Sequence, residues 1–211
     1  MTNDLAILTN DGWSDAAAEA HERAVRGTLL KFSDWRWTRG KEAAEVATGT
    51  ELVATRTARA WVKWWGGQPV ETRLCQPGTR MPEREELPDL DQILWEKGPD
   101  GKYRDPWANT RFVYLVDPHT AESFTFSTSS WGGRECVNNL GDAIGRMRAA
   151  HPDAVPVVAL EAAPMATKFG RKSKPVLRIT GWKSAGSGVW DAQQQLPLGK
   201  TDADINDVIG F

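Results

Sequence analysis

Hydrophobic and polar residues alternate in several short stretches of the chain, which is the pattern of half-buried β-strands. These stretches are rich in Val, Thr, Leu and Trp, and they are Thr28 to Trp37, Glu51 to Trp65, Val70 to Cys75, Arg111 to Val116, Ser123 to Thr128, Val155 to Glu161 and Val176 to Trp182. Gly66-Gly67 and Asp117-Pro118 favour tight turns between neighbouring strands. The chain is therefore predicted to be mainly β.

One stretch has the period of an amphipathic helix. Its apolar residues form one stripe at offsets of 0, 3, 7 and 10, and they are Val137, Leu140, Ile144 and Met147. Because Pro152 stops this pattern, it predicts a helix over Arg134 to Ala150. A second, short helix is predicted over Asp15 to Arg23, where Ser14 can act as the N-cap.

Several strands, one core helix and two further strands follow the strand-strand-strand-helix-strand-strand order of the OB-fold, a small, partly open barrel that binds oligonucleotides or oligosaccharides. We expect an OB-fold-like antiparallel barrel over residues 26–183, with a β-sandwich as the alternative. Residues 1–25 form a lead-in that contains the short helix. Residues 76–109 hold five prolines and form an insertion, and residues 184–211 form a flexible acidic tail.

The formal net charge of −2 hides an uneven distribution. Residues 184–211 carry Lys200 against four Asp, and Glu83 to Asp105 carries eight acids and four bases. The rest of residues 1–183 therefore carries 21 bases against 16 acids, which suits an anionic partner. No apolar stretch approaches the ~18 residues of a membrane helix, and the N-terminus lacks the pattern of a signal peptide. We expect a soluble, cytoplasmic protein without membrane contact.

The residues that usually bind metals are dispersed along the chain. Cys75 and Cys136 stand 61 positions apart without a CxxC pair, and His21, His119 and His151 are single. The phosphate-binding, dinucleotide-binding, zinc-protease and nucleophile-elbow motifs are also absent from the sequence. We therefore expect reduced cysteines, no metal, no cofactor and no catalytic site.

Eleven tryptophans in 211 residues is high usage, and their positions form a pattern. Alternate residues of a strand face opposite sides, so indoles and basic side chains fall together on one face of three predicted strands. These residues are Lys31, Trp35 and Trp37 in the first strand, Arg59, Trp61, Lys63 and Trp65 in the second, and Lys174, Arg178 and Trp182 in the last. Indoles stack nucleobases at ~1–3 kcal/mol each, while Lys and Arg neutralise phosphates. Together they predict a surface for single strands, although any one of these tryptophans could fill the barrel or anchor the proline-rich insertion.

The densest basic stretch runs from Lys168 to Lys174, between the last two predicted strands. An OB-fold has a binding loop at this position. Its basic and aromatic residues are therefore predicted to bind DNA, and they are Lys168, Phe169, Arg171, Lys172 and Lys174.

The last ten residues, Asp202 to Phe211, alternate acids with aliphatic residues before a terminal phenylalanine. This tip and the arrangement of the body resemble the single-stranded DNA-binding proteins of bacteria and their phages, and most of all the phage replication type. The resemblance implies an OB-fold and an acidic tip that docks replication or recombination proteins and competes with DNA for the basic groove. The docking residues it implies are Asp202, Asp204, Asp207, Ile209 and Phe211. The tip departs from the bacterial pattern in its spaced Asp residues and in Gly210, which stands where Pro is usual.

The predicted function is sequence-independent, non-catalytic binding of single-stranded DNA in replication or recombination, in the cytoplasm of a bacterial host. Two alternatives stay open. A metal-dependent nuclease would use acids such as those of Glu83 to Asp105. A carbohydrate-binding barrel would stack sugars on the indoles and would be indifferent to salt. The sequence also leaves a homo-oligomer open.

Overall fold

The structure is a computed structural model that describes residues 24–167 and 170–184. Its elements in chain order are β1 (Thr28–Ser33), β2 (Arg36–Arg39), β3 (Ala44–Val46), β4 (Glu51–Trp65), β5 (Gln68–Leu74), η2 (Arg84–Glu86), η3 (Gln92–Leu94), β6 (Glu96–Lys97), β7 (Tyr103–Arg104), β8 (Trp107–Val116), β9 (Ser123–Thr128), α2 (Trp131–Ala150), β10 (Ala154–Thr167) and β11 (Gly170–Ser184). The mainly β fold with one core helix is confirmed for these residues. The predicted N-terminal helix and the acidic tail lie outside them.

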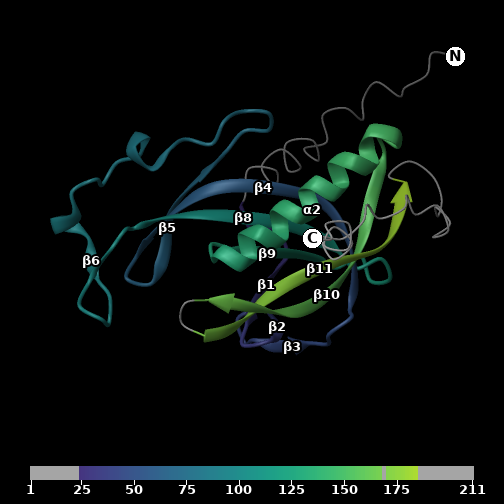
Figure 1. Cartoon of the computed structure of the whole chain (residues 1–211), viewed down its shortest axis with the longest axis horizontal. Helices are drawn as coiled ribbons and strands as arrows, with labels where there is room; N and C mark the ends of the chain where they lie inside the picture. The colour runs from purple at the N-terminus through teal and green to yellow at the C-terminus, as the bar shows by residue number, and fades with distance from the viewer. Residues whose placement is uncertain (1–23, 168–169, 185–211) are drawn as a thin grey trace, which may run out of the picture.

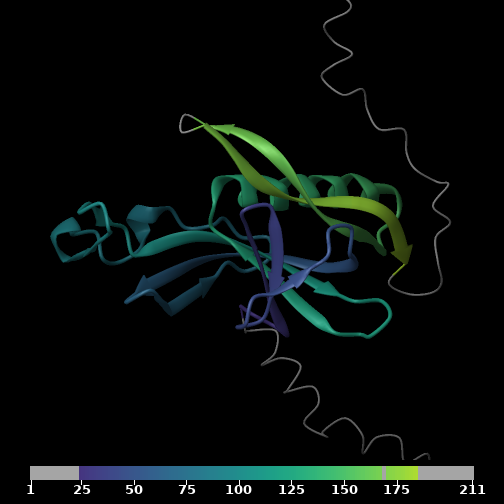
Figure 2. The ribbon, with the colours of Figure 1, turned by 90° about the horizontal axis from the view of Figure 1, so that it is seen from below.

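Nine strands form one curled sheet that resembles half of a barrel (Figure 1). The order along the sheet is β11-β10-β4-β8-β9-β1-β2-β3, and β5 pairs with the outer part of β4. Only the pairing of β1 with β9 is parallel among these described strands. Figure 2 shows α2 between the long β10–β11 hairpin and the rest of the sheet. No helix among the described residues is long and apolar enough to span a membrane.

The inner face of the curled sheet and one side of α2 enclose the main hydrophobic core. Its buried residues are Leu30, Trp37, Leu52, Ala54, Val113, Leu115, Phe124, Phe126, Val137, Leu140, Val158, Leu160 and Leu177. The helix begins at the N-cap Ser130, whose hydroxyl accepts a hydrogen bond from the Gly133 N–H. The stripe at Val137 and Leu140 therefore closes the core as the sequence predicts.

The strand β8 is buried on both faces. Val113 and Leu115 belong to the main core, while Phe112 and Tyr114 join a second cluster on the outer face. Such a strand reads as a continuous apolar run and shows no alternation in the sequence. The outer cluster explains why Arg111 to Val116 contains so many apolar residues.

A bulge in β4 changes which residues face the main core. Ala54 lies opposite Leu115, whereas Arg56 lies opposite Tyr114, so Thr55 is the extra residue. Side chains of even number before the bulge therefore face inward, and those after it face outward. Ala60 and Val62 therefore belong to the outer cluster, although an uninterrupted alternation from Leu52 would place them on the face of the main core.

The stretch Thr28 to Trp37 is a hairpin and not a single strand. β1 and β2 are joined by the two-residue turn Asp34-Trp35, and both residues have positive φ, 49° and 68°. This is the backbone signature of a type I′ turn, which Asn-Gly or Asp-Gly usually forms. Because Trp occupies the second position, the sequence gives no turn signal there.

The proline-rich residues 76–106 form an insertion that projects from the barrel beside β4 and β5 (Figure 1). It contains two short 3-10 helices and the small β6–β7 hairpin. Leu87 is its buried apolar residue, and the Arg84 side chain binds the Asp105 carboxylate at 2.6 Å. Asp105 stands two residues before the start of β8, so this ion pair ties the middle of the insertion to its C-terminal end.

Candidate nucleic-acid interface

The β10–β11 hairpin lies between two exposed tryptophans from other parts of the chain. On one side, the Trp35 N–H at the β1–β2 turn donates to Ser173 Oγ in β11 at 3.2 Å. On the other side, Gly132 packs so closely against Lys174 and Met165 that a Cβ there would lie 2.9 Å from the Lys174 Cβ. Trp131, the residue before Gly132, is 63% exposed, and Trp35 is 48% exposed. Two indoles therefore flank this hairpin at one end of the barrel.

The backbone of Trp35 is held in an unfavourable conformation. Left-handed residues other than Gly, Asn and Asp cost about 1–2 kcal/mol, and Trp has a bulky side chain. Trp35 nevertheless takes the second turn position, where its ring is half-exposed. Backbone strain of this kind clusters at functional sites. The position therefore marks Trp35 as a candidate for binding.

The predicted basic loop is mostly strand. β11 begins at Gly170, so Arg171, Lys172 and Lys174 lie on the strand itself, where Arg171 and Lys172 are exposed. The Lys174 ammonium lies 2.9 Å from the Glu135 carboxylate of α2. Arg178 lies 2.7 Å from Glu161 of β10. Lys168 and Phe169 fall outside the described residues.

Trp37, which belongs to the predicted DNA-binding surface, faces the core side of the sheet. Trp37 is 1% exposed, meets Phe32 and Phe126 edge to face, and donates from Nε1 to the Glu161 carbonyl at 2.9 Å. It lies opposite Phe32 in the hairpin, while Lys31 lies opposite Thr38 on the other face. The prediction that Lys31, Trp35 and Trp37 share one face is therefore wrong, because the turn intervenes.

The same correction applies to the last strand. Val158 pairs with Ile179 but Val157 pairs with Gly181, so Thr180 is an extra residue in β11. The register change brings Trp182 to the face of Ile179 and leaves Arg178 on the other face. Lys174 and Arg178 share a face as predicted, whereas Trp182 is half-buried on the opposite one.

Arg59, Trp61 and Lys63 of β4 share a face, and the insertion contacts all three side chains while Arg59 remains exposed. Trp61 donates from Nε1 to the Pro82 carbonyl at 2.9 Å, and the Arg59 guanidinium donates to the Thr79 carbonyl at 2.9 Å. The Lys63 ammonium lies 2.9 Å from Asp89 Oδ2. These residues anchor the proline-rich insertion, which was the alternative role for the tryptophans. Trp65 is 49% exposed near the end of the β4–β5 hairpin.

Asp89 is the main anchor of the insertion on β4 and β8. Its carboxylate accepts hydrogen bonds from Lys63 and from the Trp107 indole, at 2.9 and 3.0 Å. The bond from Lys63, followed by that from Trp107, holds the pKa of Asp89 below its usual value. The carboxylate therefore remains charged at neutral pH and fixes the insertion over the face of Trp61.

Sequence reasoning missed two arginines that the fold brings beside Arg59. Arg111 lies directly opposite Arg59 in the pairing of β8 with β4. Its Nε donates to Asn138 Oδ1 of α2 at 3.4 Å, and Arg134 stands one helical turn before Asn138. Burial, and then the neighbouring cations Arg59 and Arg134, lower the pKa of Arg111. A sequence signal would have required the strand register, which the bulge at Thr55 shifts.

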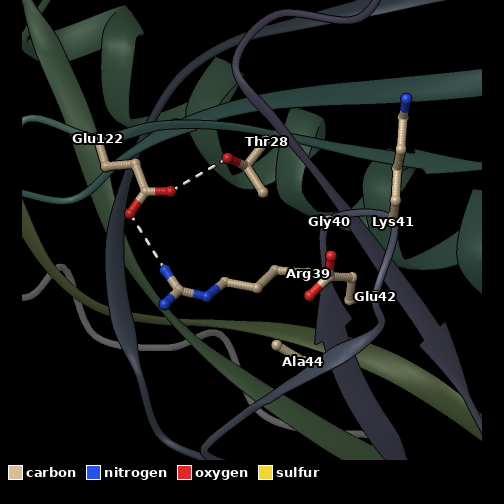
Figure 3. Close-up of a pocket in the computed structure, with 7 residues that line it drawn as sticks. All are labelled: Thr28, Arg39, Gly40, Lys41, Glu42, Ala44 and Glu122. Atoms are coloured by element: carbon tan, nitrogen blue, oxygen red, sulfur yellow. Dashed lines mark hydrogen bonds and ion pairs between the residues drawn. The ribbon is translucent and has the colours of Figure 1, made fainter.

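A shallow pocket lies on another side of the barrel, at the β1–β2 hairpin (Figure 3). The Glu122 carboxylate accepts hydrogen bonds from Thr28 Oγ1 and from the Arg39 guanidinium, both at 3.1 Å. Lys41 and Glu42 line the opposite rim. The pocket contains both signs of charge and none of the predicted DNA-binding residues, so its network serves to join the β8–β9 turn to β1 and β2.

Burial raises the pKa of the Cys136 thiol to about 11, and both cysteines are free. Within residues 24–167 and 170–184, no three His, Cys, Asp or Glu side chains gather as a metal site would require.

The chain matches no protein-family model, no curated protein and no solved structure.

Proposed function

We propose that the protein binds single-stranded DNA without sequence preference and without catalysing a reaction on it. The observation that carries this proposal is the end of the barrel where the exposed indoles of Trp35 and Trp131 flank Arg171 and Lys172. Indoles supply stacking to any base, and the basic strand neutralises phosphates. Together they give a surface for the unpaired bases and the backbone of a single strand.

The proposal includes an OB-like barrel. Its support is the chain order β4, β8, β9, α2, β10 and β11, with β10 and β9 on opposite sides of the β4–β8 pair. In such a barrel the β10–β11 hairpin is the loop between the fourth and fifth strands, a usual site of oligonucleotide binding. The β1–β2 hairpin is then an addition that places Trp35 beside this loop.

The acidic tip Asp202 to Phe211 is proposed to dock a replication or recombination protein in a bacterial cytoplasm infected by, or carrying, a phage. Its support is the sequence alone, since these residues lie outside those the structure describes. The terminal Phe ring would fill an apolar pocket, and the Asp residues would steer the tip to a basic partner.

The test is a titration with a single strand of ~30 nucleotides and with the matching duplex, followed by intrinsic Trp fluorescence at two salt concentrations. We expect quenching by the single strand that salt reverses, and weaker binding of the duplex. Trp131→Ala should weaken binding. Trp65→Ala is the comparison and should leave binding unchanged, because Trp65 is also exposed, at 49%, but lies near the end of the β4–β5 hairpin.

Three results would overturn the proposal. Equal binding of single strand and duplex would remove the stacking role of the indoles. Binding that ignores salt and favours oligosaccharides would indicate the carbohydrate-binding barrel. Cleavage of the strand in the presence of Mg²⁺ would indicate a nuclease.

A further inference from the structure

Three arginines converge where β4, β8 and the first turns of α2 meet. Arg59 and Arg111 lie opposite each other in adjacent strands, where like charges destabilise a sheet. Arg134 adds a third positive charge from α2, close enough to affect the ionisation of Arg111. Three cations this close together destabilise the folded protein unless negative groups compensate them.

Their partners within residues 24–167 and 170–184 are neutral. Arg59 donates to the Thr79 carbonyl and the Cys75 sulfur, and Arg111 contacts Asn109, Asn138 and Met81. The Arg134 Nε is buried and has no hydrogen-bond partner in this part of the chain. No described carboxylate forms an ion pair with any of the three. A buried donor without a partner destabilises the folded protein, and a bound acceptor would remove this cost.

We propose that Arg59, Arg111 and Arg134 form a binding site for an oxyanion of the phosphate class. Guanidinium groups match phosphate oxygens with paired N–H donors, and they stay charged. Arg59 is exposed, so the site is open to solvent on the side of β4. Arg134 stands three residues after the exposed Trp131, at the same end of α2.

The source of the oxyanion can be a free phosphate or a DNA phosphodiester. The link to DNA rests on the proposed function, whereas the anion site itself does not. A strand that stacks on Trp131 would pass the first turn of α2 and reach Arg134 next. The experiment therefore has one arm without DNA and one arm with it.

The first arm measures thermal unfolding with inorganic pyrophosphate against chloride at equal ionic strength. Pyrophosphate should raise the Tm of the wild type, because a ligand of the folded state stabilises it. Arg111→Gln should lose this rise, and Arg59→Gln, at an exposed position, repeats the test should Arg111→Gln fail to fold. Arg56→Gln is the control, because it makes the same change in net charge on the outward face of β4.

A rise in Tm that is the same in Arg111→Gln and Arg59→Gln as in the wild type would overturn the proposal, as would no rise in the wild type. The second arm identifies the source. If a DNA phosphate occupies the site, Arg111→Gln should lower the slope of log K against log salt for single-strand binding by about 1. An unchanged slope, with the pyrophosphate effect confirmed, assigns the site to a free oxyanion.

A second and independent observation concerns the edge of β5. Among the described strands, β5 is hydrogen-bonded to β4 alone. The Cys75 N–H donates to the Arg59 carbonyl, so the backbone groups of Leu74 and Thr72, which alternate with it, point to the free edge. Exposed edges of this kind are templates for another strand.

The sequence of β5 is complementary to itself in the antiparallel direction. A two-fold axis at Thr72 places Glu71 opposite Arg73 of the second copy, and the reverse, so the ion pair that these two residues form within one strand, at 2.6 Å, can exchange for two ion pairs between copies. Opposite charges across an antiparallel pair are favourable, whereas protective edges usually repel a copy of themselves. We infer that β5 pairs with β5 of a second copy in a symmetric dimer.

The test is a disulfide trap in a Cys75→Ser background. In a hydrogen-bonded antiparallel pair, the two Cα atoms at Thr72 would lie about 5.5 Å apart, which a disulfide can bridge. Thr72→Cys should therefore give a covalent dimer on mild oxidation. Gln68→Cys is the control on the same strand, because its two copies would lie about 27 Å apart at ~3.4 Å per residue.

Sedimentation supplies the charge test. Glu71→Arg should abolish the dimer, and the combined exchange Glu71→Arg with Arg73→Glu should restore it. Cross-linking of Thr72→Cys no faster than of Gln68→Cys would overturn the inferred dimer. This outcome is independent of DNA binding, which the titration measures separately.

Discussion

Trp35 and Trp37 stand two residues apart in one hairpin, yet the structure gives them opposite roles. Trp37 is enclosed by the core and bonded to the Glu161 carbonyl, and Trp35 is half-exposed beside Ser173. We predict that Trp37→Phe lowers stability and leaves single-strand affinity unchanged. Trp35→Asn should lower affinity and leave stability nearly unchanged.

The expected magnitudes follow from the contacts. Trp37→Phe removes the indole N–H that donates to the Glu161 carbonyl at 2.9 Å. Loss of this buried hydrogen bond should lower the free energy of unfolding by about 1–3 kcal/mol. The smaller ring also leaves a cavity between Phe32 and Phe126, which costs about 1 kcal/mol at ~24 cal/mol per Å³. The sum of about 2–4 kcal/mol corresponds to a decrease in Tm of roughly 5–15 °C for a domain of this size.

For Trp35, the lost stacking of about 1–3 kcal/mol corresponds to a roughly 5- to 150-fold weaker affinity. Asn accepts the left-handed backbone of this turn more readily than Trp does. Relief of about 1 kcal/mol of backbone strain therefore offsets part of the lost packing.

Thermal unfolding by circular dichroism and fluorescence anisotropy with a labelled single strand measure the two quantities for both variants. The affinity is measured at a temperature well below the Tm of Trp37→Phe, so that both variants are folded. If Trp37→Phe lost affinity with an unchanged Tm, the placement of Trp37 in the core would be refuted. If Trp35→Asn kept full affinity, the surface beside the β10–β11 hairpin would not bind the strand.

Three further predictions follow from the same surfaces. Replacing both Arg171 and Lys172 with Ala should lower the salt slope of single-strand binding by about 2, measured by titration at several salt concentrations. Asp89 has a lowered folded pKa, so its stabilisation is full above the usual Asp value of about 3.9 and is lost as pH falls through the folded pKa. Asp89→Asn should therefore flatten the decrease in Tm below about pH 4, and an equally steep decrease would contradict the role of Lys63. Deleting Asp202 to Phe211 should leave DNA affinity intact or raise it, because a competing anion is removed, and weaker binding would contradict that competition.

The sequence predicts elements whose local signals and tertiary environment agree. The strand Ser123 to Thr128 is found with the same bounds, and the helix predicted from its apolar stripe starts only three residues earlier, at Trp131. Its N-cap Ser130 is a strong local signal. The strand β10 extends to Thr167, whereas the sequence predicts its end at Glu161. The added residues pair with the polar start of β11, which has no apolar signal in the sequence.

The candidate site was harder to predict because side-chain direction depends on register. Thr55 and Thr180 each add one residue to a strand, and each reverses the face of every later side chain. Thr is common in ordinary strands, so nothing in the sequence marks these two positions as bulges. The tryptophans were therefore recognised as a group, but the bulge at Thr180 reversed the face of Trp182, and the turn at Asp34-Trp35 reversed that of Trp37.

The chain carries two basic, Trp-rich surfaces, and the acidic insertion distinguishes them. Over β4 the insertion holds Trp61 through the Pro82 carbonyl and Lys63 through Asp89, so a strand of DNA would have to displace these contacts. Residues 83–105, with eight acids against four bases, would also repel its phosphates. At the β10–β11 hairpin, no described segment covers Trp35 and Trp131, which are 48% and 63% exposed. A single strand is therefore expected to approach along the hairpin and the first turn of α2, and to meet the β4 surface only at the arginine cluster.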